Sequence, residues 1–130
     1  MIHRALGTHT IVPALNGKVI DEHYGRASSD TDAYSVAHMF APAGWSEPAQ
    51  LCQFDEINLI VSGQLAVETE AGTTVVGAGE SCQVPSGVRV RYRNASAAIP
   101  CEYWSLCVPA WRPDRVRIEG QNEGQTEGLQ

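Results

Sequence analysis

The stretch Gly44-Trp45-Ser46-Glu47-Pro48-Ala49-Gln50-Leu51-Cys52-Gln53-Phe54-Asp55-Glu56-Ile57-Asn58-Leu59-Ile60-Val61-Ser62-Gly63 decides the fold. Its second half, Phe54–Val61, is a short run rich in apolar residues that ends at Ser62-Gly63, which is typical of a β-strand closed by a tight hairpin. Similar runs recur on both sides, bounded by turn residues and spaced by about 8–12 residues. They are Lys18–Tyr24, Tyr34–Phe40, Gln64–Glu70, Thr73–Val76, Cys82–Val84, Val88–Tyr92 and Glu102–Val108. No window of helical length carries an apolar stripe, so the sequence predicts an all-β domain.

Size and charge limit what the domain can do. The chain has 130 residues, with Lys+Arg 9 against Asp+Glu 15 and a formal net charge of −6. A domain of this length buries about two thirds of its unfolded surface, which is enough for a hydrophobic core. The chain turns polar beyond Arg112, so residues 1–112 are expected to form a single domain and residues 113–130 a flexible tail. The acidic charge argues against a nucleic-acid partner, since phosphate binding needs clustered cations.

Cysteine usage and the N-terminus indicate a cytoplasmic protein. The four cysteines form no CxxC pair and are expected to be free thiols in a reducing compartment. Charged and histidine residues interrupt the N-terminus, and no apolar run approaches the ~18 residues of a membrane span. We therefore expect no membrane partner.

Two stretches resemble the paired sequence motifs of the cupin family. The first motif matches at Gly44, Glu56 and Gly63. The second motif matches at Gly79, Pro85, Gly87 and Asn94. The resemblance spans residues 35–108 and implies a double-stranded β-helix, the cupin jelly-roll barrel, which is commonly a homodimer.

The same motifs carry the metal ligands of most cupins, and in this chain those ligands are largely replaced. The family pattern has His residues and one Glu where this sequence has Gln50, Cys52, Glu56 and Val90. A neutral amide is a weak metal donor, and a valine side chain is none. The expectation is therefore no cofactor. The alternative is a divalent metal held by His38, Gln50, Cys52 and Glu56.

Within the family, the chain is similar to small single-domain bacterial cupins related to those of ethanolamine utilisation. The likeness rests on Gly44–Gln50, Phe54–Glu56 and Cys107–Trp111, with Tyr24-Gly25 and Ser35–His38 upstream.

Strand alternation predicts which side chains line the barrel interior. The motif position of Glu56 implies that it points inward, and residues two apart share a face. The residues expected inside with it are Gln50, Cys52, Phe54, Asn58, Ile60, Val88, Val90 and Tyr92. The same parity places Arg89, Arg91 and Arg93 outside. Tyr34, Val36, His38 and Phe40 form one set whose side is left open.

Four of these side chains, together with Glu47, are candidates for chemistry. Glu56, enclosed by apolar walls, is expected to have a raised pKa and to act as general acid/base, or else to hold a structural hydrogen bond. Glu47 is expected over the barrel mouth as a second carboxyl, or on the surface as a loop acid. Tyr92 would donate to an oxyanion or be a core aromatic. His38 is either a cavity acid/base or a core histidine. Cys52 is interpreted mainly as a filler, because no cation lies nearby in the sequence to lower its pKa.

The remaining candidates would bind a small-molecule substrate. Gln50 would orient a carbonyl or hydroxyl group, and Trp45 at the mouth would stack on a planar ligand. Phe54, Asn58, Val90 and Cys52 would complete the walls.

These residues favour one function and leave two alternatives. The first is a non-redox acid–base enzyme of the lyase, isomerase or cyclase type, acting on a small carbonyl-containing molecule, with specialised biosynthesis as the expected setting. The second is a metal-dependent cupin with an atypical ligand set. The third is a non-catalytic cupin that binds a small ligand, because function depends on the site and not on the barrel.

Overall fold

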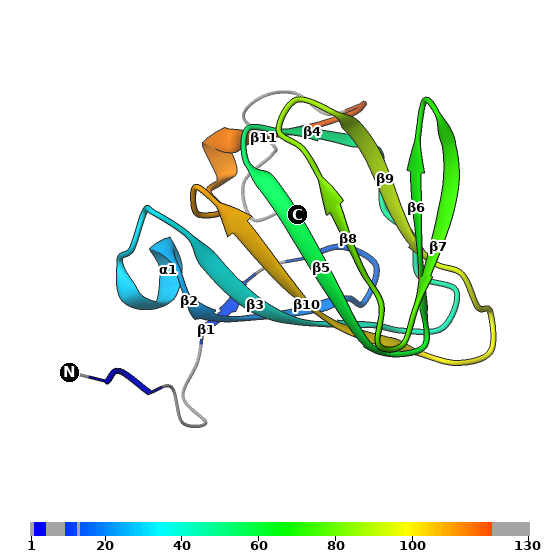
Figure 1. The fold of residues 1–130 in the computed structure, drawn as a ribbon, viewed down its shortest axis with the longest axis horizontal. Helices are drawn as coiled ribbons and strands as arrows, with labels where there is room; N and C mark the ends of the chain where they lie inside the picture. Colours follow the sequence, from blue (N-terminus) through cyan, green and yellow to red (C-terminus); the bar gives the residue numbers. More distant parts are fainter. Residues whose placement is uncertain (1, 5–9, 13, 121–130) are drawn as a thin grey trace.

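The computed structural model describes residues 2–4, 10–12 and 14–120. In this part of the chain two antiparallel sheets face each other and form a double-stranded β-helix, as predicted (Figure 1). The six-stranded sheet has the order β1-β2-β3-β10-β5-β8, and the five-stranded sheet has the order β11-β4-β9-β6-β7. The strands are β1 Thr10–Val12, β2 Val19–Tyr24, β3 Ser35–Ala41, β4 Gln50–Cys52, β5 Asp55–Ser62, β6 Gln64–Thr69, β7 Gly72–Gly77, β8 Ser81–Val84, β9 Arg89–Asn94, β10 Cys101–Val108 and β11 Val116–Ile118. The helices are α1 Arg26–Ser29 and the 3₁₀ turn η1 Pro113–Arg115, and neither is long or apolar enough to cross a membrane.

Each strand expected from the sequence is present with its ends shifted by at most two residues. The three strands that the sequence did not indicate, β1, β4 and β11, have three residues each, which is too short for an alternation pattern. The barrel core lies between the two sheets and includes Met39, Phe54, Leu65, Tyr92 and Tyr103, all at most 2% exposed.

The hairpin predicted at Ser62-Gly63 is wrong. β5 pairs with β10 and β8, whereas β6 pairs with β7 and β9, so this turn carries the chain from one sheet to the other. Gly63 has a φ of 79°, and a Cβ there would meet the backbone of Pro100 and Cys101. The position therefore requires glycine for its backbone conformation and for a close approach.

Replacing Gly63 with alanine should destabilise the barrel far more than the same change at Gly79. Both glycines have positive φ, 79° and 81°, which costs an L-residue about 1–2 kcal/mol. Only at Gly63 does the new methyl group also clash with backbone, which adds about 1–3 kcal/mol, because a Cβ on Gly79 meets nothing within 4 Å. Thermal unfolding of Gly63→Ala and Gly79→Ala measures the difference, and equal melting temperatures would contradict the close approach.

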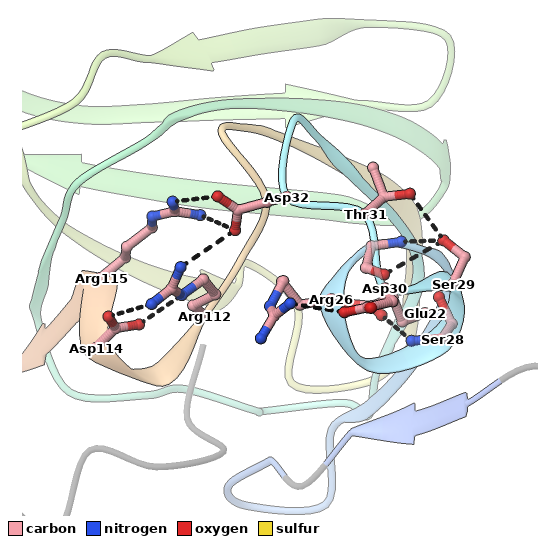
Figure 2. Close-up of polar contacts among 11 residues, drawn as sticks. Glu22, Arg26, Ser28, Ser29, Asp30, Thr31, Asp32, Arg112, Asp114 and Arg115 are labelled. Carbon is pink, nitrogen blue, oxygen red and sulfur yellow. Dashed lines mark hydrogen bonds and ion pairs between the residues drawn. The ribbon is translucent and has the colours of Figure 1, made fainter.

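The polar tail predicted from residue 113 begins too early. η1 and β11 belong to the barrel, since β11 pairs with β4 and both Val116 and Ile118 are 4% exposed. Figure 2 shows the ion pairs that hold η1 against the loop before β3. Arg115 and Arg112 both contact Asp32 of that loop, at 3.0 Å and 3.3 Å, and Arg112 also contacts the neighbouring Asp114 at 2.7 Å. The sequence predicts a tail from residue 113 because residues 113–130 have little apolar content but several Glu, Gln, Asn and Gly. Residues 121–130 lie outside the described part of the chain.

Candidate active site in the barrel interior

Polar side chains enter the barrel from β4 and β5. Gln50, Cys52, Glu56 and Asn58 are each at most 6% exposed, because alternate residues of the two strands face the opposite sheet. The predicted shared face is therefore confirmed. A barrel of this size is usually filled by apolar side chains, so buried carboxyl and amide groups need a chemical explanation.

The walls around these groups also follow the predicted alternation. Phe54, Ile60, Val90 and Tyr92 are buried, at most 4% exposed. The neighbouring arginines of β9 lie on the outside and pair with acids there: Arg91 with Glu68, Arg93 with Glu68, and Arg89 with Glu119.

Glu47 lies inside the barrel, and both placements considered for it, at the mouth or on the surface, are wrong. Its side chain is 6% exposed, and the Gln50 Nε2 donates a hydrogen bond of 2.8 Å to Glu47 Oε1. Two backbone contacts fix the loop: Glu47 N donates to Tyr92 O at 3.3 Å, and Arg91 Nε donates to Glu47 O at 3.1 Å. Burial raises the pKa of Glu47 to about 8, with Glu56 adding to the shift and Lys18 opposing it. Glu47 therefore carries a proton at neutral pH.

Glu56 is the second buried carboxyl and has a different set of partners. It is 5% exposed, and the Ser105 hydroxyl donates a 2.8 Å hydrogen bond to its Oε2. Burial raises the pKa of Glu56, whereas hydrogen bonding from Ser105, the charge of Lys18 and hydrogen bonding from Tyr92 oppose the rise. Hydroxyl donors stabilise the charged carboxylate, so Glu56 is better suited than Glu47 to accept a proton.

Asn58 and Tyr92 lie close together beside Glu56. Asn58 Nδ2 donates to the Tyr92 hydroxyl oxygen at 3.4 Å, and Asn58 is 0% exposed. The Asn58 Oδ1 is buried and accepts no hydrogen bond from the residues that the structure describes. Burial raises the pKa of Tyr92 well above its ordinary value, so the phenol keeps its proton and remains a hydrogen-bond donor.

Cys52 is not an activated thiol. Burial, together with the charges of Glu56 and Glu47, raises the pKa of the Cys52 thiol. The Sγ lies 3.7 Å from Gln50 Oε1, to which it donates. A thiol without a nearby cation stays protonated and unreactive, which agrees with its interpretation as a filler.

Two candidate residues, His38 and Trp45, do not lie where the sequence analysis predicted. His38 is on the outer face of the six-stranded sheet, with Nε2 2.6 Å from Glu102 Oε2 and its ring packed edge-on against Trp104. The cavity and core interpretations of His38 are therefore both wrong. Trp45 is 3% exposed within the core, and its Nε1 donates to Leu15 O at 3.0 Å, so it does not lie open at a mouth.

Comparison with known proteins now decides the family. Residues 37–121, which are more than half of the chain, match the family model of the Cupin domain. The chain is a cupin. A curated relative from Myxococcus xanthus named endoribonuclease YbeY is 45% identical over 109 residues, which make up 84% of this chain and 37% of that protein. The cupin thus spans little more than a third of that relative's length.

Solved structures show the same fold at low sequence identity. The polyketide cyclase RemF from Streptomyces resistomycificus has a TM-score of 0.73 at 14% identity, with 100% of each chain covered. Streptomyces PAC13, as a variant solved with uridine, has a TM-score of 0.73 at 15% identity, with 96% of this chain and 97% of that chain covered. The EutQ protein of Clostridium difficile has a TM-score of 0.56 at 15% identity, with 72% of this chain and 63% of that chain covered. The resemblance to cupins, EutQ-type proteins included, is confirmed.

The family's metal positions do not suit a metal in this cupin. The Gln50 amide is already engaged on both sides, by Glu47 and by Cys52. Val90 has no donor atom, and His38 lies outside the barrel. Over the described ranges, no three His, Cys, Asp or Glu side chains are grouped to hold a metal ion. This donor set does not fit a divalent transition metal.

Three buried side chains of the candidate site were missed by the sequence reasoning. Lys18, Tyr103 and Ser105 are 7%, 1% and 1% exposed and face the barrel interior with the two carboxyls. Ser105 and Tyr103 share the inward parity of β10, which the alternation rule would have found if it had been applied to that strand. Lys18 directly follows Asn16-Gly17, a dipeptide typical of tight turns, which was the available signal.

Proposed function

We propose that this cupin is a non-redox acid–base enzyme of the lyase, isomerase or cyclase type, which acts on a small carbonyl-containing molecule inside the barrel. One observation carries the proposal: two buried carboxyls, Glu47 and Glu56, both have raised pKa values but different hydrogen-bond partners. Titratable groups whose environments differ in this way take opposite proton-transfer roles in acid–base enzymes. The metal-independence proposed here rests on the donor set described above.

The different partners assign a role to each carboxyl. Glu56, as a carboxylate held by Ser105, would remove a proton from the carbon next to the substrate carbonyl, and the C–H electron pair would move onto the carbonyl oxygen. Glu47, which holds a proton at neutral pH, would return one at a second atom or to a leaving oxygen. The single Tyr92 O–H contributes a hydrogen bond to Glu56, so Tyr92 would position that carboxylate. Gln50 acts as a positioning residue, since its amide is bonded to Glu47.

The similar structures support an enzyme without naming its reaction. RemF is described as a polyketide cyclase, and the PAC13 variant was solved with uridine. An aldol-type ring closure joins a carbon next to one carbonyl group to the carbon of another, so it begins with the same proton removal. At 14% and 15% identity these proteins share the fold, and the argument for this cupin rests on its own carboxyls.

Hydrogen exchange tests the proposal without knowledge of the natural substrate. Cyclohexanone, acetophenone and lactaldehyde are incubated with the protein in deuterium oxide, and loss of the proton signals next to the carbonyl is followed by NMR. The expected result is exchange of at least one compound faster than in buffer, with a rate that saturates. Compounds that raise the melting temperature but are recovered without deuterium would contradict an enzyme and favour the ligand-binding alternative.

We also propose that the cupin forms a homodimer through the outer face of its six-stranded sheet. Phe40, Leu59, Val61 and Val108 lie on this face and are 38–50% exposed, on three adjacent strands. Trp104 lies opposite Leu59 on β10. An antiparallel sheet usually shows polar residues to water, and a contiguous apolar patch marks a contact surface.

Light scattering after gel filtration checks the dimer. The wild-type protein should have twice the 14.0 kDa mass of the chain, and Leu59→Lys should shift it to a monomer. Val75→Lys is the matched control, because Val75 is 50% exposed on β7 of the other sheet. A monomeric wild type, or a dimer that tolerates Leu59→Lys, would refute this interface.

A further inference from the structure

We propose that Lys18 is the oxyanion-binding residue of the barrel, where its ammonium group receives an anionic oxygen of the ligand, such as a carboxylate, phenolate or enolate. The proposal deepens the proposed function by naming the group that would hold the enolate oxygen. Only the binding of an enolate depends on the proposed function, because an enolate forms in that reaction. The binding of a ready-made anion follows from the geometry alone.

A rigid turn places Lys18, which is the only lysine of the chain. Asn16 and Gly17 have φ values of 61° and 83°, and Lys18 N donates to Leu15 O at 3.2 Å, the geometry of a type I′ turn. Asn16 Nδ2 donates to Ser46 O at 2.6 Å. The Trp45 Nε1 donates to Leu15 O, which ties the other end of the turn to the barrel. These contacts fix the point from which the lysine side chain enters.

The ammonium group of Lys18 lies over two buried aromatic rings. Its Nζ is 4.5 Å from the ring centroid of Trp45 and 5.2 Å from that of Tyr103, and the residue is 7% exposed. Ring faces stabilise the charged form of the amine but leave its three N–H donors free. The charge of the Glu56 carboxylate acts on it from a distance. Among the described residues, the Nζ has no ion-pair or hydrogen-bond partner.

The Lys18 ammonium group carries free N–H donors on a side chain that is 7% exposed, and its Nζ is not among the fully enclosed atoms that lack a partner, so a ligand can reach it. Glu47 and Glu56 do not accept a hydrogen bond from the Lys18 ammonium group. Gln50 donates to Glu47, and Ser105 donates to Glu56. An anionic ligand oxygen over the rings would accept the free N–H groups.

A second unpaired group on the interior face defines the other end of the ligand. Asn58 Oδ1 is buried and has no donor among the described residues, and Asn58 follows Glu56 by two positions on β5. A buried amide oxygen of this kind requires a hydroxyl or N–H group. The ligand class is therefore a small molecule with one oxygen that carries or develops negative charge and one hydrogen-bond donor, on an apolar or aromatic frame.

In the proposed reaction the charge of Lys18 acts on one step. The C–H bond breaks, Glu56 takes the proton, and the electron pair forms an enolate whose oxygen is bound by the Lys18 ammonium group. The positive charge is already in place when the oxyanion forms, so no reorganisation is needed. Lys18 acts only through its charge and its N–H donors, and no covalent bond to the substrate is formed.

Isothermal titration with para-nitrobenzoate and its neutral near-isostere para-nitrobenzamide tests the site at neutral pH. The wild-type protein should bind the benzoate at least about ten times more tightly than the benzamide, which is the strength of one charge-assisted contact. Lys18→Met should abolish this preference with little change in benzamide affinity, and Lys18→Arg should retain part of it. The benzamide serves as the control for folding, together with the melting temperature.

The outcomes separate the two proposals. A wild type without preference for the anion, or a Lys18→Met variant that binds benzoate as tightly as the wild type, overturns the role of Lys18. Glu56→Gln should keep the preference for benzoate while losing ketone exchange. If the preference for benzoate is present but no carbonyl compound exchanges, the oxyanion site stands and the enzymatic function fails.

Discussion

Replacement of Glu56 with glutamine is expected to slow exchange of the proton next to a bound carbonyl by about 10²- to 10⁴-fold, the usual contribution of a general base. The amide has nearly the same shape and can still accept the Ser105 hydrogen bond, which is 2.8 Å long in the wild type. It cannot take up a proton at neutral pH. The loss should therefore appear in the exchange rate and not in the fold, and NMR of the ketone signal in deuterium oxide measures it.

The matched control is Glu70→Gln, which makes the same chemical change in an exposed turn between β6 and β7. Its exchange rate and melting temperature should equal those of the wild type. An exchange rate in Glu56→Gln within about twofold of the wild type, in a folded protein, would show that another group is the base.

The free energy of unfolding is expected to fall as the pH rises from 4.5 to about 8, because Glu47 holds its proton in the folded barrel. The folded pKa is raised from 4.5 to about 8, so the contribution of Glu47 to stability is complete below pH 4.5 and is lost as the pH rises through 8. The shift corresponds to about 5 kcal/mol. The pKa of Glu56 is also raised, and its effect has the same sign.

Glu47→Gln isolates this effect, since the variant has no proton to lose. Urea unfolding at several pH values should show that the variant has a shallower dependence than the wild type and is more stable than it at pH 8 and above. The pKa values of four other acids are lowered, so their contribution to the free energy of unfolding is lost as the pH falls, below the pH window of Glu47. These acids are Asp32, Glu68, Asp114 and Glu119. Parallel pH profiles of variant and wild type would contradict a buried, protonated Glu47.

Much of the barrel could be predicted from the sequence because its strands alternate. The period of two placed Gln50, Glu56, Asn58 and Tyr92 on the interior face, and the spacing of Gly44, Glu56 and Gly63 indicated the cupin fold. The strands that alternate over six or more residues were found, whereas those of three residues were not. Short strands are defined by their partners, and β11 exists because β4 pairs with it.

The rest of the site depends on contacts between distant segments. Lys18 and Trp45 are 27 positions apart, and their stacking follows from a turn that the loop before β4 holds in place. Glu47 lies in the loop before β4, where alternation gives no direction, so its burial could not be read from the sequence. His38 was misplaced because its strand was given no fixed parity, and the inner set of β3 is in fact Ser35, Ala37, Met39 and Ala41.

The central claim is that the barrel interior holds an acid–base pair in which Glu47 keeps its proton at neutral pH. The most direct test is a pH titration of the glutamate side-chain carboxyl carbons by NMR, with Glu47→Gln used to assign the signal. The account predicts that Glu47 titrates near pH 8. Titration of Glu47 at its ordinary value near 4.5, together with the exposed glutamates, would contradict the account.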